Sequence, residues 1–165
     1  MKTNKTILRL IETAITAQKG AYCPYSRYRV GAAVLTDKGR IFSGSNVENA
    51  SYGLSICAER VAIFNAVARG HRALKAVCVV ASSAHPCGAC RQVMIEFSGK
   101  DTELYLVDLN PASGRRRITK TTVLRMLPAA FDPIASGLLP PNPQNLLRAK
   151  HAPRRGSRRK TRRSR

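Results

Sequence analysis

The chain has 165 residues, of which 44% are apolar, and this is enough for one domain with a hydrophobic core. No apolar run approaches the roughly 20 residues that span a bilayer, and charged residues interrupt the first ten-residue segment, so we expect a soluble protein without a signal peptide. The formal net charge is +20, and ten of the 29 Lys and Arg residues lie within residues 148–165, which contain no acid. We therefore expect a folded domain over residues 1–147 and a basic, disordered tail over residues 148–165.

The first half of the chain predicts a helix, a β-hairpin and a second helix. Apolar residues at helical spacing over Lys5–Lys19 predict the first helix. Small and β-branched residues over Arg29–Thr36, a turn, and an extended pattern over Ile41–Ser43 predict the hairpin. A 3.6-residue periodicity over Ser55–Arg69 predicts the second helix.

The second half continues this alternation of helices and strands. The continuous apolar run Leu74–Ala81 predicts a strand buried on both faces, hence central in its sheet, and Gly88–Phe97 predicts an amphipathic helix. Strands are expected at Leu104–Asp108 and Arg117–Thr119, and a short helix at Thr122–Leu127. The order of elements predicts an α/β fold, a three-layer α/β/α sandwich with a five-stranded mixed sheet.

The five cysteines divide into two groups. Their odd number, without an export signal, favours a reducing compartment such as the cytoplasm. Cys23 and Cys78 have no partner motif and are expected to be buried packing residues. Cys57, Cys87 and Cys90 can instead hold one zinc, and three protein ligands leave the fourth position open, as catalytic zinc sites do. Both segments open predicted helices, whose N-terminal partial charge favours thiolates.

Two charged residues follow the first of these cysteines. Glu59 is expected to take a proton from a zinc-activated water and to deliver it to a ring nitrogen and a departing amine. Arg60 is expected to donate hydrogen bonds to the cysteine sulfurs and so to offset the negative charge of three thiolates; the alternative is a surface arginine. For the metal, the alternative is a structural site in which His85 supplies the fourth ligand.

The pattern Cys-x-Glu followed by Pro-Cys-x-x-Cys is a variant of the zinc nucleobase deaminase signature. The stretches Gly44–Leu54, Ile56–Arg60 and Pro86–Val93 closely resemble the small, homotetrameric cytidine deaminases, and the resemblance extends from about Lys5 to Phe131. It implies zinc-dependent hydrolysis of cytidine and deoxycytidine at C4 to uridine and deoxyuridine, with release of ammonia, in pyrimidine salvage. It also implies one zinc per subunit, bound by the three cysteines, with Glu59 as proton shuttle.

The resemblance further implies contacts with the nucleoside. Asn46 and Glu48 match ribose-hydroxyl contacts, which would reject ligands lacking those hydroxyls; the alternative is a turn at a strand end. Tyr28 stands where the family usually has a Phe that packs beside the base, and its hydroxyl needs a partner if it is buried. His85 also departs from the family, which often has Ser at this position.

The last residues that resemble the family, up to Phe131, imply an active site shared between subunits. Phe131 matches a Phe that reaches into the site of a neighbouring subunit, together with Ala50 and Tyr52; the alternative is an ordinary core residue. A monomer would then lack a complete pocket, and we expect a homotetramer. The implied substrate contacts are Tyr28, Asn46, Glu48, Ala50, Tyr52, Ala58 and Phe131.

Two other functions stay open. The basic tail predicts weak, salt-sensitive binding of nucleic acid or another polyanion, a nuclear address in a eukaryote, or only a solvated extension. It supports the alternative of an RNA- or DNA-associated protein with a deaminase-like domain. The other alternative is deamination of a cytosine nucleoside antibiotic such as blasticidin S, although those enzymes lack the stretch seen at Asn46–Asn49.

Overall fold

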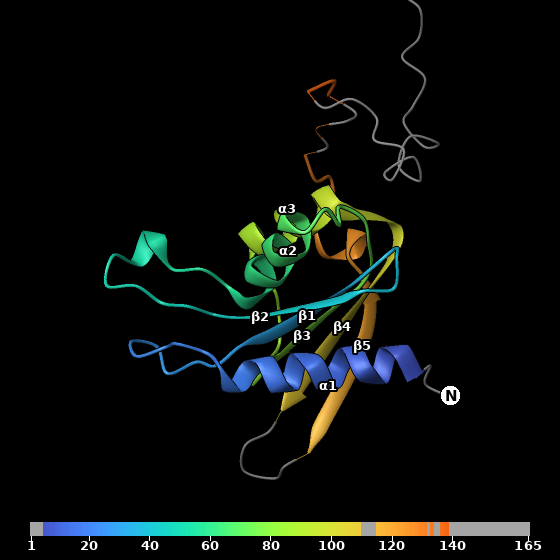
Figure 1. The fold of residues 1–165 in the computed structure, drawn as a ribbon. Coiled ribbons are helices and arrows are strands. Elements are labelled where there is room, and N and C mark those ends of the chain that lie inside the picture. Colours follow the sequence, from blue (N-terminus) through green and yellow to red (C-terminus); the bar gives the residue numbers. More distant parts are fainter. Residues whose placement is uncertain (1–4, 110–114, 132, 134–135, 139–165) are drawn as a thin grey trace, which may run out of the picture.

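The computed structural model describes residues 5–109, 115–131, 133 and 136–138 (Figure 1). The domain boundary expected at residue 147 and the basic tail lie outside these residues. Within them, no helix is long and apolar enough to cross a membrane.

The five strands form one mixed sheet in the order β2-β1-β3-β4-β5. β3 is central, pairs in parallel with β4 and antiparallel with β1, and the two outer pairs are antiparallel. This confirms the predicted five-stranded mixed sheet and its central strand. The strands are β1 (Gly31–Thr36), β2 (Ile41–Ser45), β3 (Leu74–Ala81), β4 (Ser98–Leu109) and β5 (Arg116–Thr122).

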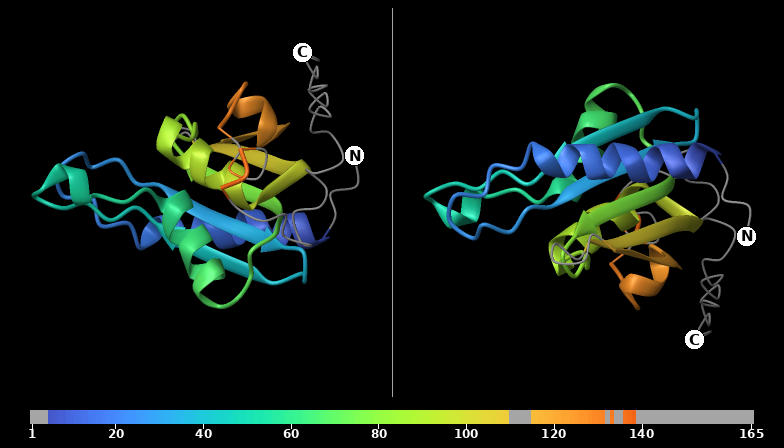
Figure 2. Two further views of the ribbon diagram at one scale, coloured as in Figure 1. Left: turned by 90° about the horizontal axis from the view of Figure 1, so that it is seen from above. Right: turned by 90° about the horizontal axis from the view of Figure 1, so that it is seen from below.

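Helices cover both faces of the sheet, which confirms the three-layer sandwich (Figures 1 and 2). α1 (Lys5–Lys19) lies on one face and buries its apolar stripe against β1, β3 and β4. α2 (Ala58–Ala68) and α3 (Gly88–Phe97) lie on the other face, over a second apolar core. Cys78 is fully buried on the α1 side of β3. Cys23 is also buried, so both packing predictions are confirmed.

The short helix predicted at Thr122–Leu127 is wrong in extent. Thr122 is the last residue of β5, paired with Glu103 of β4, and only the 3-10 turn η2 (Leu124–Met126) follows. A second 3-10 turn, η1 (Tyr52–Leu54), was not predicted. β-branched threonines favour the extended backbone, and pairing with β4 holds them there.

β4 and α2 also differ from their predicted bounds. β4 starts at Ser98, six residues before the prediction, because Leu74 of β3 pairs with Ser98 across a polar stretch that has no strand pattern. α2 starts at Ala58 rather than Ser55, because Cys57 takes an extended backbone with φ −75° and ψ 151° and becomes the N-cap.

Close backbone packing places α2 on the sheet. A Cβ atom added to Gly44 of β2 would lie 2.5 Å from the backbone nitrogen of Ala62 and 2.8 Å from the carbonyl oxygen of Ala58. No real Cβ makes such contacts, so only glycine allows this approach. Gly44 therefore sets the distance between the sheet and the start of α2.

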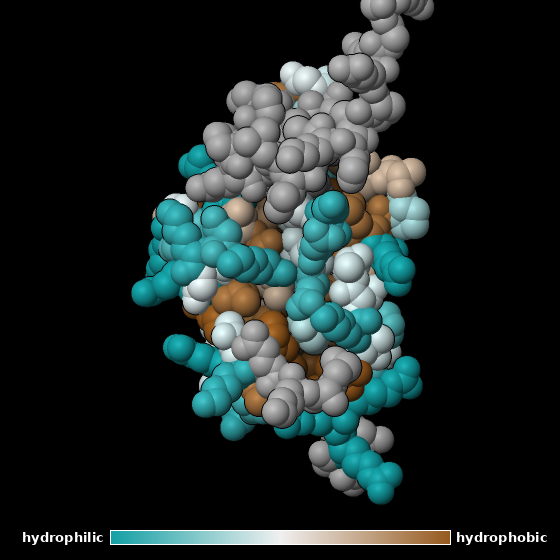
Figure 3. All heavy atoms as spheres, turned by 90° about the vertical axis from the view of Figure 1, so that its right-hand side faces the viewer, coloured by the Kyte–Doolittle hydropathy of each residue, from teal (hydrophilic) through white to brown (hydrophobic). Residues whose placement is uncertain are grey.

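At the opposite edge of the sheet, β5 pairs with β4 and presents exposed basic residues. Arg116 forms an ion pair with Glu12 of α1 at 2.6 Å, and Lys120 pairs with Glu103. Figure 3 shows the right-hand side of Figure 1, where hydrophilic side chains surround smaller apolar areas. Charged residues on an edge strand disfavour pairing with the strands of other molecules.

Candidate metal and substrate site

Three cysteines meet where α2 and α3 begin. Cys57 is the N-cap of α2, Cys87 is the N-cap of α3, and Cys90 lies in the first turn of α3. Their sulfur atoms all lie within 4.8 Å of one another, and those of Cys57 and Cys87 are 4.0 Å apart. Tetrahedral zinc with Zn–S bonds of about 2.3 Å holds its sulfurs about 3.8 Å apart. The three thiols therefore have the chemistry and spacing that one zinc requires.

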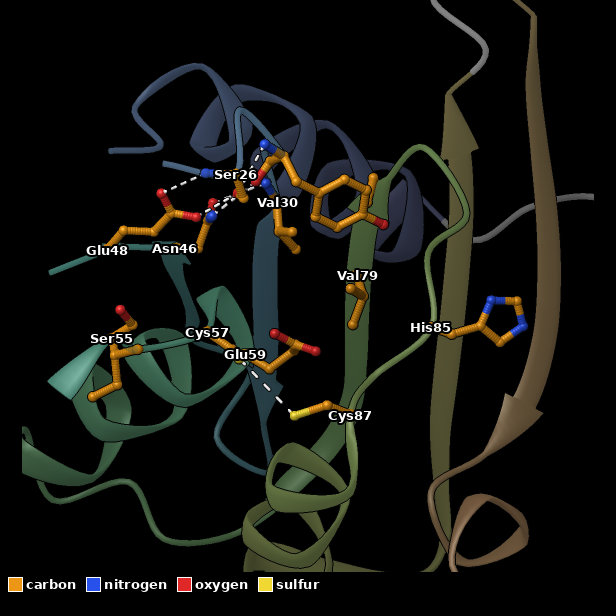
Figure 4. Close-up of a pocket in the computed structure, with 13 residues that line it drawn as sticks. Ser26, Val30, Asn46, Glu48, Ser55, Cys57, Glu59, Val79, His85 and Cys87 are labelled. Carbon is orange, nitrogen blue, oxygen red and sulfur yellow. Dashed lines mark hydrogen bonds between the residues drawn. The ribbon is translucent and has the colours of Figure 1, made fainter. Parts of the chain in front are cut away.

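His85 is not part of this cluster. Among the described residues, the three cysteines form the group that could hold a metal, and His85 is not in it. Its imidazole points away from Cys87 (Figure 4). The geometry therefore gives no support to a closed structural site with His85 as its fourth ligand.

Arg60 contacts the cysteine cluster from the first turn of α2. Its Nη2 donates to the sulfur of Cys57 at 3.7 Å and to the carbonyl oxygen of Ser55 at 3.4 Å. Hydrogen bonding with Cys90, together with that from Arg60, lowers the pKa of Cys57 to about 5. The adjoining helix N-terminus also favours the thiolate. Arg60 is thus placed to offset the charge of a thiolate cluster rather than lying free on the surface.

Glu59 is a buried carboxyl group beside the cysteines. Only 3% of the residue is exposed, and burial raises the pKa of Glu59 to about 7. Its side chain projects into the pocket near Cys57 and Cys87 (Figure 4). A carboxyl group with this pKa can both accept and donate a proton near neutral pH.

Cys57, Cys87 and Glu59 line a pocket of about 280 Å³. Six of the twelve predicted site residues line it in the single chain. The other six do not, and they are Ala50, Tyr52, Ala58, Arg60, Cys90 and Phe131. Six further lining residues were missed, because neutral side chains in loops and strands give no sequence signal of a pocket. The predicted lining residues are Tyr28, Asn46, Glu48, Cys57, Glu59 and Cys87, His85 also lines it, and the missed ones are Ser26, Val30, Ser55, Ile56, Val79 and Ala81.

The side chains of Asn46 and Glu48 hold residues 25–30, which lead into β1, by hydrogen bonds. The Asn46 side chain accepts a hydrogen bond from the backbone nitrogen of Val30 and donates one to the carbonyl oxygen of Tyr28, both at 2.9 Å. Glu48 accepts hydrogen bonds from Ser26 and from the backbone nitrogen of Tyr25, and the Ser26 hydroxyl lowers the pKa of Glu48. These contacts hold the pocket wall and leave oxygen lone pairs for a ligand.

Tyr52 and Phe131 are exposed in the single chain. Tyr52 is 73% exposed on a loop that projects beyond the sheet, and Phe131 is 58% exposed (Figure 2). Gln92 of α3 donates a hydrogen bond to the carbonyl oxygen of Phe131 at 3.1 Å, which ties this residue to the helix that carries Cys90. The alternative that Phe131 is a core residue is therefore wrong.

A three-layer α/β/α domain with three clustered cysteines and a buried glutamate at two helix N-termini defines a metal-dependent hydrolytic class of protein. Residues 4–106 match the family model described as the cytidine and deoxycytidylate deaminase zinc-binding region. The chain belongs to this cytidine deaminase family. The zinc-binding family and the cysteine cluster together give one zinc per chain as the cofactor.

Individual relatives agree with this assignment. The chain is 50% identical over 125 residues to a cytidine deaminase of Halalkalibacterium halodurans, covering 74% of this chain and 91% of that protein. It is 44% identical over 127 residues to one of Sporosarcina psychrophila, covering 75% and 90%. The solved cytidine deaminase from Burkholderia pseudomallei superposes with a TM-score of 0.66 at 46% identity, over 75% of this chain and 98% of that structure.

Proposed function

We propose that this chain hydrolyses cytidine and deoxycytidine to uridine and deoxyuridine, with release of ammonia, as a step of pyrimidine salvage. One observation carries this proposal: a single pocket brings Cys57 and Cys87 of the cysteine cluster and buried Glu59 together with two polar side chains, Asn46 and Glu48. The first group suits hydrolysis at a ring carbon, and the second suits recognition of a sugar.

Cys57, Cys87 and Cys90 would hold the zinc, and Arg60 would offset their negative charge. When bound, the metal supplies Lewis-acid activation of the attacking water. Glu59 accepts the proton of the attacking water at its carboxylate and donates it to N3 of the base. It then accepts the proton of the hydroxyl group added at C4 and donates that proton to the 4-amino group, which leaves as ammonia. Because burial raises the pKa of Glu59 to about 7, both directions of transfer are accessible near neutral pH.

The remaining predicted residues would bind the nucleoside. Asn46 and Glu48 accept hydrogen bonds from the backbone of Val30 and Tyr25. Their oxygens keep further lone pairs, and these would contact the ribose hydroxyls. The ring of Tyr28 packs beside the base. Ala58 is fully buried next to Glu59 and does not line the pocket of the single chain, so its proposed contact with the nucleoside would be made at the start of α2 once the ligand is bound.

The pocket would be completed by neighbouring copies in a homotetramer. Ala50, Tyr52 and Phe131 lie on the surface of the single chain, and Leu54 beside Tyr52 is 72% exposed. Large exposed apolar side chains near one another mark surfaces that associate. We expect these residues to enter or border the site of a second subunit.

For the rest of the chain, we propose a catalytic domain over residues 1–147 in a cytoplasmic protein. The basic residues 148–165 would bind polyanions weakly and only at low salt. Deletion of these residues should leave turnover unchanged and abolish retention of the protein on RNA at low salt. Lost turnover in this variant would contradict the boundary.

The test of the proposed function is the fall in ultraviolet absorbance when cytidine is mixed with the purified protein. Glu59→Gln should lower kcat by about 100- to 10,000-fold, because it removes general acid–base catalysis. Its zinc content and Tm should be unchanged. The matched control is Glu12→Gln on α1, whose carboxylate meets Arg116 far from the pocket.

Full activity of Glu59→Gln would refute the role of this residue. Blasticidin S and single-stranded RNA should be assayed in parallel. Turnover of either without turnover of cytidine would refute the proposed substrate.

A further inference from the structure

The loop between β3 and α3, residues 82–86, leads directly into Cys87. Its residue His85 lines one wall of the pocket together with Ala81 and Cys87. Tyr28, which precedes β1, reaches this loop from the opposite wall. Its single hydroxyl proton is shared between the carbonyl oxygens of Ser82 at 2.6 Å and Ser83 at 3.1 Å. The hydroxyl of Tyr28 thus has the partners that the sequence required of it, and they belong to the loop.

The loop has a backbone conformation that needs such contacts. Ser83 has a φ of +65°, in the left-handed region that residues other than glycine rarely adopt. Such a conformation persists when the surrounding contacts determine it. Two further side chains hold the loop in this conformation. Asp108 of β4 accepts a hydrogen bond from the backbone nitrogen of Ala84 at 2.5 Å. Arg91 of α3 donates one to the carbonyl oxygen of Pro86 at 2.7 Å.

Tyr28 is itself held firmly. Its backbone nitrogen donates to the Ser26 hydroxyl at 3.0 Å, and its carbonyl oxygen accepts from Asn46 at 2.9 Å. Ser26 in turn is bound to Glu48. A continuous series of hydrogen bonds therefore runs from the proposed ribose contacts, through Tyr28, to the loop that precedes Cys87.

We propose that Tyr28 is a positioning residue, whose hydroxyl fixes the 82–86 loop against the ribose wall and thereby sets the width of the pocket for the base. This inference rests on the proposed deamination. A phenylalanine at this position fills the same space, but it lacks the hydroxyl that joins the two walls. The hydroxyl acts through the loop, whereas the ring alone faces the base.

Tyr28→Phe tests this inference, with Tyr105→Phe as its matched control. The Tyr105 hydroxyl donates to the Glu103 carboxylate at 2.6 Å on the α1 side of the sheet, so the control loses a similar group away from the pocket. Tyr28→Phe should raise the KM for cytidine roughly five- to tenfold, as expected for the loss of hydrogen bonds that shape the site. Its kcat should stay within about twofold, because Glu59 is held separately on α2.

Two further measurements separate positioning from other effects. Amide hydrogen exchange in the peptide that contains residues 82–91 should be faster in Tyr28→Phe and unchanged in Tyr105→Phe. The zinc content should stay at one per chain in both. Unchanged KM and exchange would overturn the inference.

Other outcomes are equally decisive. A raised KM without faster exchange would overturn the inference, because the hydroxyl would then act on the substrate itself. Loss of zinc in Tyr28→Phe would also overturn it. Wild-type protein inactive on cytidine would refute the proposed function, whereas the exchange comparison would still decide whether Tyr28 holds the loop.

Discussion

Gly44→Ala should disturb the site from a distance, through the packing of α2 on β2. The added Cβ would meet the backbone nitrogen of Ala62 at 2.5 Å, whereas ordinary contacts begin at 3.4 Å. α2 would have to retreat by about 0.9 Å, since both contacting groups are backbone and cannot rotate away. The first turn of α2 carries Cys57 as its cap and Glu59 as its buried acid, so both would move.

Gly44→Ala should lower both the stability of the protein and its turnover of cytidine. Overpacking of this kind costs about 1–3 kcal/mol, which for a domain of this size lowers the Tm by roughly 3–10 °C. Misplacement of a catalytic group by about 1 Å can cost about 100-fold in rate, so kcat should fall by about 10- to 100-fold.

Calorimetry and the cytidine assay measure these two quantities. Gly20→Ala is the matched control, because its added Cβ would meet its nearest atoms at 3.5 and 3.6 Å. A Gly44→Ala protein with the Tm and kcat of this control would refute the packing argument.

Three further predictions address other parts of the molecule. Arg60→Ala should lower zinc affinity or turnover by about 10- to 100-fold, because it removes the hydrogen bond to the Cys57 sulfur; unchanged zinc content and turnover would exclude the role. Cys78 is fully buried and burial raises its pKa to about 12, so a thiol reagent should leave it unmodified in the native protein and modify it after denaturation, as mass spectrometry of the peptides would show. Leu54→Glu should reduce the mass measured by light scattering below that of a tetramer, and cytidine turnover with it; an unchanged mass would place the interface elsewhere.

Much of the fold could be predicted from the chain itself. The bounds of α1, β3 and α3 agree with the prediction, because amphipathic periodicity and continuous apolar runs are properties of short segments. The polar start of β4 and the threonine-rich end of β5 could not be placed in this way. Their extended conformation comes from pairing with a neighbouring strand, which no local pattern records.

The candidate site was also predictable only in part. The spacing of Cys57, Glu59, Cys87 and Cys90 was enough to predict a metal site with an acid beside it, because helix N-termini present their first residues in a fixed geometry. The direction of His85 was not predictable, and neither was the partner of the Tyr28 hydroxyl, 54 residues away in the chain. The orientation of His85 and the partner of the Tyr28 hydroxyl depend on which loops lie next to each other once the sheet has formed.

By itself, the sequence predicted the chemistry of this protein: which side chains could hold a metal, move a proton and contact a sugar, and that the cysteines and Glu59 lie at the starts of two helices. Only the tertiary structure decided that Glu59 is buried enough for a pKa of about 7. It also decided that Phe131 faces outward and that the two pocket walls are joined through Tyr28. The physical reason is that residue type and local periodicity are encoded along the chain, whereas burial and hydrogen-bond partners arise from segments that meet only after folding.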